Sequence, residues 1–345
     1  MAKRRIGLMT GGGDAPGLNG IIESIVRSLA SEEITIVGIQ DGFEGIYSGR
    51  TRALDRENVW NAHAEAGTLL GTSNKIGTKG REQEFLKAFA ALQLDGLIAA
   101  GGDGTFEGLS RVIHDLKLIG VPKTIDNDLA GTDVTFGFDT ACAVVSEAVD
   151  ALRATADAHR RVIVVEAMGR TSGWIALGGG LTSYADAILL PEKPIERARL
   201  KAYLETLQKK ERRGAMIVVG EGAHFEGESR QVALRVAGSP QAERYGGISE
   251  RIARWVEAET GWESRHIILG HLQRSRHPTT TDRFMTAAMG IEVARMVKEQ
   301  DWGKAVVMRD GRVTRAPLSD IMKPARLVQD DHRWVEFART LGLYV

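Results

Sequence analysis

The sequence lacks several features that mark specialised classes of protein. It has one cysteine, Cys142, in 345 residues, which excludes an internal disulfide framework and a site built from several thiolates. No stretch reaches the ~18 apolar residues that a membrane-spanning helix needs. Lys plus Arg and Asp plus Glu number 45 each, so the charge gives no bias towards a polyanion. We therefore expect a folded cytoplasmic protein whose partners include neither nucleic acid nor a membrane.

Two common nucleotide-binding signatures are also missing. No Gly-x-x-x-x-Gly-Lys-Ser/Thr sequence occurs, so a P-loop is absent. Residues 11–17 read Gly-Gly-Gly-Asp-Ala-Pro-Gly, but Pro16 interrupts the usual dinucleotide spacing and no acidic residue ends the following strand. These observations disfavour a dinucleotide cofactor, although glycines between a strand and a helix still suit a phosphate.

Short apolar runs alternate with longer helical patterns along the chain. Buried strands are predicted at 6–9, 34–39, 96–100, 161–165, 215–219 and 266–269, and a helix at 18–29. This alternation predicts an α/β fold with mostly parallel sheets that helices cover on both faces. Glycines follow most of these strands, at the strand ends where α/β proteins bind their ligands.

Two loops carry the residue types that phosphoryl transfer requires. Residues 122–128 read Pro-Lys-Thr-Ile-Asp-Asn-Asp, which places a cation, a hydroxyl and two carboxylates on one loop. Such groups can accept a proton and neutralise a phosphoryl group. Residues 101–105 read Gly-Gly-Asp-Gly-Thr, and one aspartate with phosphate oxygens suffices to bind Mg²⁺. Either loop alone would equally fit a solvated turn or a helix N-cap.

Further motifs follow these loops in order. They are Thr-Phe-Gly-Phe-Asp-Thr-Ala at 135–141, Glu-Ala-Met-Gly-Arg at 166–170, Gly-His-Leu-Gln-Arg at 270–274 and Asp-Arg at 282–283. Together they resemble phosphofructokinase family A across nearly the whole chain. The resemblance implies two Rossmann-like three-layer α/β/α domains. It also implies ATP-dependent phosphorylation of the 1-hydroxyl of fructose 6-phosphate, giving fructose 1,6-bisphosphate in glycolysis.

The resemblance implies roles for individual residues. Asp126 would be the general base, Thr124 would hold the phosphoryl group in transit, and Mg²⁺ would bind at Asp103. The expected catalytic residues are Gly12, Lys75, Lys123, Thr124 and Asp126. The expected donor-binding residues are Gly12, Asn74, Lys75, Gly102, Asp103, Gly104 and Thr105. The expected substrate-binding residues are Thr124, Asp126, Asp128, Arg161, Met168, Gly169, Arg170, Glu221, Arg265, His271 and Arg274.

The resemblance also bears on assembly and domain organisation. In the family, the arginines that correspond to Arg161 and Arg265 reach in from a neighbouring subunit, which implies a homodimer or homotetramer with shared active sites. The chain is expected to cross between domains near residue 138 and to return. The predicted donor-binding domain comprises 1–137 and 250–303, and the sugar-phosphate-binding domain comprises 138–249 and 304–345.

The sequence departs from the family pattern in two places. Asn74 stands where an arginine usually stabilises the transferring phosphoryl group, and we expect the adjacent Lys75 to supply a point charge instead. Residues 274–277 read Arg-Ser-Arg-His in place of Arg-Gly-Gly, which would add bulk and charge beside the sugar-phosphate pocket and could alter the acceptor preference.

The phosphoryl donor could be ATP or pyrophosphate. Pyrophosphate-dependent members carry aspartate at the position of Gly104 and lysine at that of Lys123, so this chain is mixed and resembles the family's group III. Gly104 leaves room for a nucleotide, and we therefore expect ATP. Two alternatives stay open: a kinase for NAD or a lipid, since segment 101–105 occurs there too, and a weakly active regulatory subunit, which Asn74 would suit.

Overall fold

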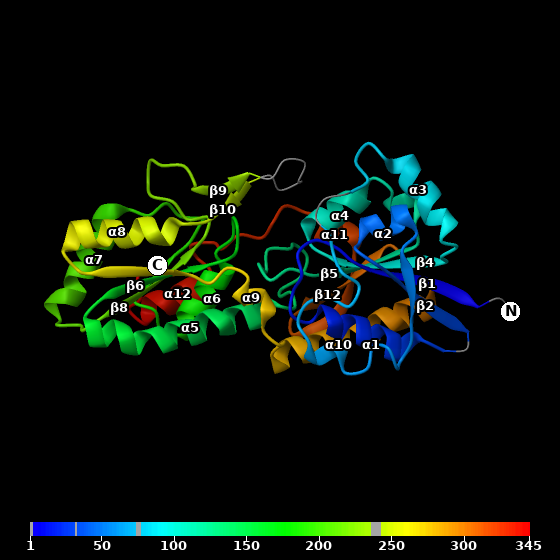
Figure 1. The fold of residues 1–345 in the computed structure, drawn as a ribbon, viewed down its shortest axis with the longest axis horizontal. Helices are drawn as coiled ribbons and strands as arrows, with labels where there is room; N and C mark the ends of the chain where they lie inside the picture. Colours follow the sequence, from blue (N-terminus) through cyan, green and yellow to red (C-terminus); the bar gives the residue numbers. More distant parts are fainter. Residues whose placement is uncertain (1–2, 32, 74–76, 236–242) are drawn as a thin grey trace.

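The computed structural model describes residues 3–31, 33–73, 77–235 and 243–345. These residues form two α/β lobes that lie end to end (Figure 1). Among the described residues, no helix is both long and apolar enough to cross a membrane. The expected cytoplasmic location stays a prediction.

The first lobe is built on a seven-stranded sheet in the order β13-β12-β5-β4-β1-β2-β3. Its strands are β1 (Arg4–Thr10), β2 (Ile34–Ile39), β3 (Thr51–Leu54), β4 (Gly96–Gly101), β5 (Leu118–Pro122), β12 (Lys304–Arg309) and β13 (Arg312–Pro317). The edge strands β3 and β13 are antiparallel to their neighbours, and the strands between them are parallel. In this sheet β2 lies on one side of β1, whereas β4 and β5 lie on the other, so the strand order reverses at β1. Ligands of α/β proteins bind at such a switch point, at the carboxyl ends of the strands.

Alternating side chains of this sheet pack under two layers of helices. Ile6 and Leu8 belong to the core shared with α1 and α10, whereas Met9 faces the opposite side and packs with α2, α3, α4 and α11. These helices are α1 (Leu18–Leu29), α2 (Phe43–Ser48), α3 (Glu82–Ala91), α4 (Asp103–Ser110), α10 (Thr280–Glu299) and α11 (Leu318–Ile321). The lobe is therefore a three-layer α/β/α sandwich.

The second lobe repeats this architecture on a parallel four-stranded sheet in the order β11-β6-β8-β7. Its strands are β6 (Val162–Ala167), β7 (Ala187–Leu189), β8 (Ala215–Gly220) and β11 (Ser264–Ile268), and a separate hairpin pairs β9 (Val232–Arg235) with β10 (Glu243–Tyr245). Val165 packs towards α5, α6 and α12, while Val164 packs towards α7 and α8. Those helices are α5 (Phe138–His159), α6 (Trp174–Thr182), α7 (Arg197–Lys209), α8 (Ile248–Thr260) and α12 (Arg333–Thr340).

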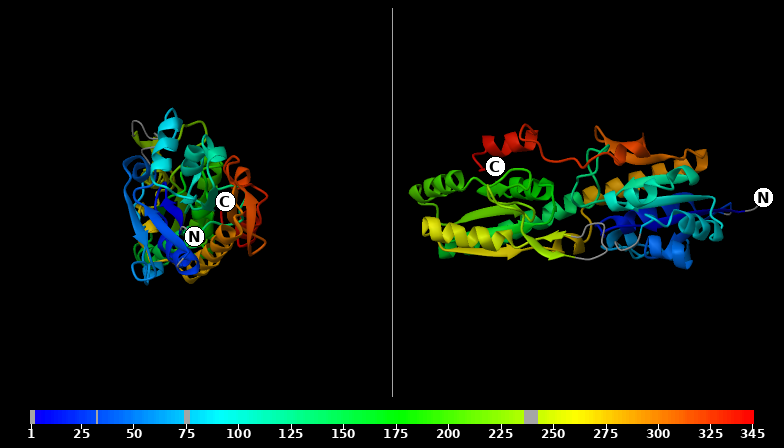
Figure 2. Two further views of the ribbon diagram at one scale, coloured as in Figure 1. Left: turned by 90° about the vertical axis from the view of Figure 1, so that its right-hand side faces the viewer. Right: turned by 90° about the horizontal axis from the view of Figure 1, so that it is seen from above.

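The predicted α/β fold with mostly parallel sheets is confirmed, but the predicted domain limits are wrong in two places. Residues 304–317 form β12 and β13 of the first sheet, because β12 pairs with β5 through Lys304–Ile119 and Ala305–Gly120. Residues 250–268 belong to the second lobe, where β11 pairs with β6. The chain thus crosses between the lobes before α5, again before α10, and a third time after α11, as the view from above shows (Figure 2).

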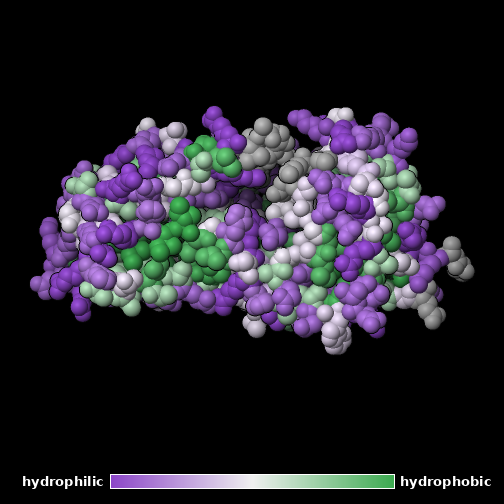
Figure 3. Space-filling model, viewed as in Figure 1, coloured by the Kyte–Doolittle hydropathy of each residue, from purple (hydrophilic) through white to green (hydrophobic). Residues whose placement is uncertain are grey.

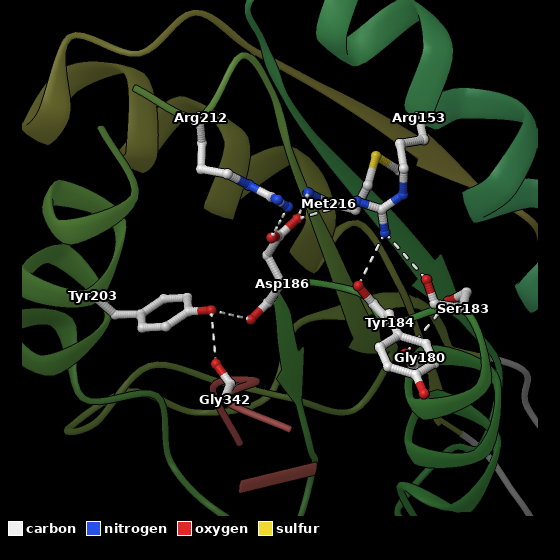
Figure 4. Close-up of polar contacts among 9 residues, drawn as sticks. All are labelled: Arg153, Gly180, Ser183, Tyr184, Asp186, Tyr203, Arg212, Met216 and Gly342. Atoms are coloured by element: carbon white, nitrogen blue, oxygen red, sulfur yellow. Dashed lines mark hydrogen bonds and ion pairs between the residues drawn. The ribbon is translucent and has the colours of Figure 1, made fainter. Parts of the chain in front are cut away.

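A buried carboxylate ties the second sheet to the elements around it (Figure 4). Asp186, 5% exposed, precedes β7 and accepts hydrogen bonds from the Met216 amide at 2.9 Å and from Arg212 at 2.8 Å. Its backbone carbonyl accepts a 2.8 Å hydrogen bond from the hydroxyl of Tyr203, which also reaches the carbonyl of Gly342. Asp186 therefore connects β7 to a side chain of α7 and to a backbone amide of β8. Through Tyr203 it is also connected to the last residues of the chain.

Candidate active site

The carboxyl ends of both parallel sheets face a cleft of about 1080 Å³ between the lobes. The cleft brings together most of the residues predicted from the sequence. These are Gly12, Gly102, Asp103, Gly104, Thr105, Lys123, Thr124, Asp126, Asp128, Met168, Arg170, Glu221, His271 and Arg274. Residues that follow β1, β4 and β5 line one wall, and residues that follow β6, β8 and β11 line the other.

Residues 123–128 leave the end of β5 in a tight, well-bonded turn. Asn127 has a positive φ of 53°, a conformation that asparagine tolerates better than most residues. Its buried side-chain oxygen accepts a 3.0 Å hydrogen bond from the Thr135 amide, and the Asp126 amide donates to Thr124 Oγ1 at 3.1 Å. From the second lobe, Ser172 Oγ donates to the Asp126 carbonyl at 3.2 Å. The loop is therefore held from both lobes with Asp126 facing the cleft.

Cations surround Asp126 and counteract the cost of burying its charge. Burial raises the pKa of Asp126, and the charges of Arg274, Lys123 and Arg170 oppose that rise. One carboxylate oxygen, Oδ1, is buried without a hydrogen-bond partner among the described residues. A buried acceptor of this kind is a site where a proton or a cation would be stabilised.

Three further acidic groups of the cleft, those of Asp128, Glu221 and Asp103, have pKa values that are shifted towards the neutral form. Burial and the carboxylates of Asp126 and Asp103 raise the pKa of Asp128 to about 8. Burial and Asp126 raise the pKa of Glu221 to about 7. Desolvation and the charge of Asp126 also raise the pKa of Asp103. This residue lines the cleft and is exposed. Grouped carboxylates with raised pKa values indicate a place that favours a cation.

Lys123 is the buried cation of this loop, with only 2% of its surface exposed. Burial and the charge of Arg274 lower its pKa to about 7. Its ammonium donates to the carbonyl of Gly13, which connects the turn after β5 to the glycine loop after β1. Lys123 therefore lines the cleft at the place where the loop after β5 contacts the glycine loop after β1.

The glycines of the phosphate loops leave different amounts of space. A Cβ at Gly11 would lie 2.6 Å from Thr105 Oγ1, so the loops after β1 and β4 approach each other as closely as glycine permits. At Gly104, in contrast, a Cβ would meet no protein atom within 4 Å. Gly104 lines the cleft, and a side chain there would occupy space open to a ligand.

The second lobe supplies a polar wall. Gly169 has φ 138°, and a Cβ there would lie 2.3 Å from the Ser172 carbonyl, so only glycine allows this turn. Arg170 follows with φ 48°, and its amide donates to Glu221 at 2.9 Å. Arg274, from the short helix α9 (Leu272–Ser275), donates across the cleft to the Asp14 carbonyl. Two arginines and His271 thus face the carboxylate loop.

Several predicted residues lie elsewhere. Arg161 and Arg265 stand at the amino ends of β6 and β11, opposite the cleft, where both pair with Glu263. Gly169 shapes the wall through its backbone but does not line the cleft. Asn74 and Lys75 lie outside the described residues.

Two residues of the second sequence departure, Arg276 and His277, are also directed away from the cleft. Arg276 pairs with Glu147 on α5, and His277 contacts the Ala64 carbonyl at 2.8 Å. Neither side chain lines the cleft. The expectation that this departure adds charge beside the sugar-phosphate pocket is therefore not supported by the structure.

Sequence reasoning missed a group of residues that complete the cleft. Some belong to the donor side of the first lobe and others to the β9–β10 hairpin. They are Phe43, Lys79, Arg81, Arg111, Leu234, Glu243, Arg244 and Tyr245. No motif marks them, because they reach the cleft only through the packing of elements that are distant in the sequence.

The described residues contain no cluster of three or more His, Cys, Asp or Glu side chains that could cage a metal by themselves. The donor set nevertheless fits Mg²⁺, which commonly takes one or two carboxylates and fills its shell with water and phosphate oxygens. Asp103 is exposed in the cleft, and the unpartnered Oδ1 of Asp126 lies on the facing loop. After burial, the charge of Asp126 raises the pKa of Asp103, a repulsion that a divalent cation would relieve.

Comparison with known proteins agrees with this geometry. The phosphofructokinase family model matches residues 5–297. The chain belongs to the phosphofructokinase family. It is 38% identical over 335 residues to ATP-dependent 6-phosphofructokinase 2 of Streptomyces coelicolor, which covers 95% of this chain and 97% of the relative. The resemblance to phosphofructokinases that the motifs predicted is confirmed.

Other phosphofructokinases extend the comparison. The chain is also 38% identical, over 320 residues, to the pyrophosphate–fructose 6-phosphate 1-phosphotransferase of Amycolatopsis methanolica, with 92% of this chain and 94% of the relative covered. The phosphofructokinase structure from Saccharomyces cerevisiae matches with a TM-score of 0.81 and 27% sequence identity. That match covers 93% of this chain but 45% of the yeast chain, so the present chain spans less than half of the yeast protein's length.

Proposed function

We propose that the protein is an ATP-dependent 6-phosphofructokinase, which transfers a phosphoryl group to the 1-hydroxyl of fructose 6-phosphate. The observation that carries this proposal is the placement of Asp126 between glycine loops on one wall and Arg170, His271 and Arg274 on the other. A dianionic sugar phosphate requires cations with directed hydrogen bonds, which arginine provides. A kinase for NAD or a lipid would have no use for this second wall.

In this proposal, Asp126 accepts the proton of the sugar hydroxyl as the oxygen attacks the phosphoryl group. Arg274, Lys123 and Arg170 favour the ionised form of its carboxylate, since their charges oppose the effect of burial, which raises its pKa. Thr124 and Lys123 stabilise the phosphoryl group in transit, and the loop at Gly12 holds the donor phosphates. Asp128 completes the acidic loop. We also propose that Lys75 supplies the charge of the missing family arginine, next to Asn74.

Mg²⁺ would be held by Asp103 on the donor side. When bound with the donor, the ion supplies charge neutralisation for the phosphate oxygens. Gly102 and Thr105 shape the loop around it, and Glu221, Met168 and Gly169 form the surface against which the sugar lies.

Sequence identity does not distinguish ATP from pyrophosphate as the donor, because relatives of both donor types are 38% identical to this chain. A side chain at position 104 would project into the cleft without meeting protein, so glycine leaves this space open for a nucleotide. This open space favours ATP as the donor. The buried Lys123 is compatible with either donor. Pyrophosphate-dependent transfer to the same acceptor is therefore the second candidate.

We further propose a homodimer or homotetramer in which Arg161 and Arg265 serve the active site of a neighbouring subunit. Both arginines face away from their own cleft, at the amino edge of the second sheet. The edge strand β11 exposes Ile267 (37%) and Ile268 (52%). A hydrophobic patch is visible on the surface of the second lobe (Figure 3). Exposed apolar strands at a sheet edge are commonly covered by another chain.

The deciding experiment is a turnover assay on purified protein with Mg²⁺, fructose 6-phosphate, and ATP or pyrophosphate in parallel. We expect fructose 1,6-bisphosphate with ATP as the better donor. Asp126→Asn should lower kcat by about 10²–10⁴-fold, because general base catalysis contributes that much. Asp115→Asn, an exposed aspartate outside the cleft, is the matched control. Near-normal turnover by Asp126→Asn would show that another group takes the proton.

A further inference from the structure

Arg326 connects the catalytic loop to the second lobe although it lies almost 200 residues away in the sequence. We propose that Arg326 is a positioning residue, which fixes the backbone on the carboxyl side of Asp126 so that the carboxylate stays aligned with the acceptor hydroxyl. This inference rests on the proposed function, because it assigns Arg326 a part in the same reaction. Arg326 does not line the cleft.

Two hydrogen bonds attach Arg326 directly to the loop. Its guanidinium donates from Nη2 to the Asn127 carbonyl at 3.0 Å. Its own amide donates to the Asp128 carbonyl at 2.6 Å. These are the two carbonyls that follow Asp126, so one residue satisfies both acceptors at the point where the chain turns. Asn127 adopts its positive φ at this turn, a conformation that persists only when surrounding contacts support it.

The opposite side of Arg326 is held by the second lobe. Its guanidinium carbon lies 4.7 Å from the ring centroid of Trp174, a residue that is 3% exposed at the start of α6. The indole N–H donates to the Arg326 carbonyl at 2.8 Å. Cation–aromatic stacking of this kind fixes the guanidinium plane as well as its position.

A buried carboxylate reinforces this attachment. Glu192 accepts hydrogen bonds from the amides of Gly173 and Val328, both at 2.9 Å. It thereby joins the start of α6 to the chain segment that carries Arg326. Ser172, immediately before Gly173, donates to the Asp126 carbonyl. The loop is thus bound on consecutive carbonyls, at 126, 127 and 128, by groups that are themselves fixed to the second lobe.

The catalytic consequence follows from the position of these bonds. A general base must lie within hydrogen-bond reach of the proton that it removes, and small displacements of a catalytic group can cost about 100-fold in rate. Loss of the Arg326 guanidinium would free the Asn127 carbonyl, directly after Asp126, without removing any group that touches the sugar. We therefore expect the chemical step to suffer and substrate affinity to change little.

The test compares Arg326→Met, Arg326→Lys and the control Arg333→Met, which alters an exposed arginine on the neighbouring helix α12. Methionine preserves the aliphatic stem on Trp174 and the backbone hydrogen bonds of residue 326, but its side chain donates no hydrogen bond to the Asn127 carbonyl. We expect Arg326→Met to lower kcat by about 10–100-fold while KM for fructose 6-phosphate changes less than about threefold. Arg326→Lys, which retains a donor and the charge, should recover part of the loss, and Arg333→Met should behave as the unaltered protein.

Hydrogen exchange supplies a readout that does not depend on turnover. Amides between residues 122 and 136 should exchange faster in Arg326→Met than in Arg333→Met. If the unaltered protein fails to phosphorylate fructose 6-phosphate but this difference in exchange is seen, the proposed function falls and the positioning role stands. Unchanged kcat and unchanged exchange would overturn the role of Arg326. A loss of kcat matched by an equal loss of folded protein, without recovery by lysine, would reduce it to a contribution to stability.

Discussion

At the scale of a single residue, we expect Gly104 to determine the preference between the two phosphoryl donors. Because a Cβ there meets no protein atom within 4 Å, Gly104→Asp should fold normally and place its carboxylate in the space proposed for the nucleotide. We expect kcat/KM for ATP to fall by at least about tenfold more than that for pyrophosphate, since binding a nucleotide beside an added carboxylate loses both space and charge complementarity. Parallel assays with the two donors measure this ratio.

A neighbouring glycine provides the contrast for that experiment. A Cβ at Gly101 would lie 2.4 Å from Thr105 Oγ1, so Gly101→Ala should lower the stability of the lobe by roughly 1–3 kcal/mol through overpacking. Gly104→Ala should leave the melting temperature unchanged. An equal loss of ATP and pyrophosphate use in Gly104→Asp would remove the steric argument for ATP.

Lys123 should govern the pH dependence of the reaction. Its positive charge lowers the pKa of Asp126, against the effect of burial, so removing that charge raises the pKa of the carboxyl group. In Lys123→Met the acid limb of the kcat/KM profile should therefore move to higher pH, because Asp126 stays protonated over a wider range. The profile of kcat/KM against pH reports groups of the free enzyme and is the appropriate measurement. If the acid limb does not move, Lys123 does not influence the ionisation of Asp126.

At the scale of secondary structure, Asp186 should be a principal contributor to the stability of the second lobe. Its carboxylate accepts from Arg212 and from the Met216 amide, and it is almost fully buried. Asp186→Ala would leave a buried amide without a partner and Arg212 without its counterion. We expect the free energy of unfolding to fall by about 3–5 kcal/mol.

Calorimetry or denaturant unfolding would measure this loss. Asp150→Ala, which removes an exposed carboxylate from α5 in the same lobe, is the matched control and should change stability by less than about 0.5 kcal/mol. A similar midpoint for both variants would mean that water or a neighbouring side chain replaces the contacts of Asp186.

The elements themselves were largely predictable, because the local patterns that define them are strong. The strand over 6–9 and the helix over 18–29 both occur, and the loop at 101–105 begins at the end of the predicted strand β4. The loop at 122–128 lines the same cleft at the end of β5, a strand that was not predicted. Sheet membership was less accessible. The apolar run in β12 would suit either sheet, and only its pairing with β5 assigns it to the first. Local sequence carries no information on such distant pairing.

The same physical limit explains which site residues escaped prediction. Tyr245 and Arg326 lie in segments without a phosphate-binding or acid–base motif, and they reach the cleft or its loop through tertiary packing alone. Conversely, Arg161 and Arg265 correspond to family positions that bind the sugar phosphate, but they lie outside the cleft of their own chain.

At the scale of the assembled molecule, mixing two inactive variants tests the shared active site. Asp126→Asn should lack the base, and Arg161→Ala should lack a charge that a neighbour's site requires. If sites are shared, hetero-oligomers formed by joint refolding or co-expression should regain activity, because some clefts then combine an intact Asp126 with an intact Arg161. Activity should appear only after mixing.

Two results would contradict this arrangement. Full activity of Arg161→Ala alone would show that the arginine has no part in catalysis, and failure of the mixture to regain activity in a proven oligomer would place each site within one chain. The double variant in a single chain, mixed with unaltered protein, controls for simple dilution.

The three crossings of the chain between the lobes have a consequence for how this molecule can be divided. The first sheet draws β1–β5 from one part of the chain and β12–β13 from a later part, with most of the second lobe between them. No contiguous fragment contains the complete first lobe without most of the second. A proteolytic nick before α5 would therefore yield two pieces that remain interlocked through a shared sheet, and separation would require denaturation.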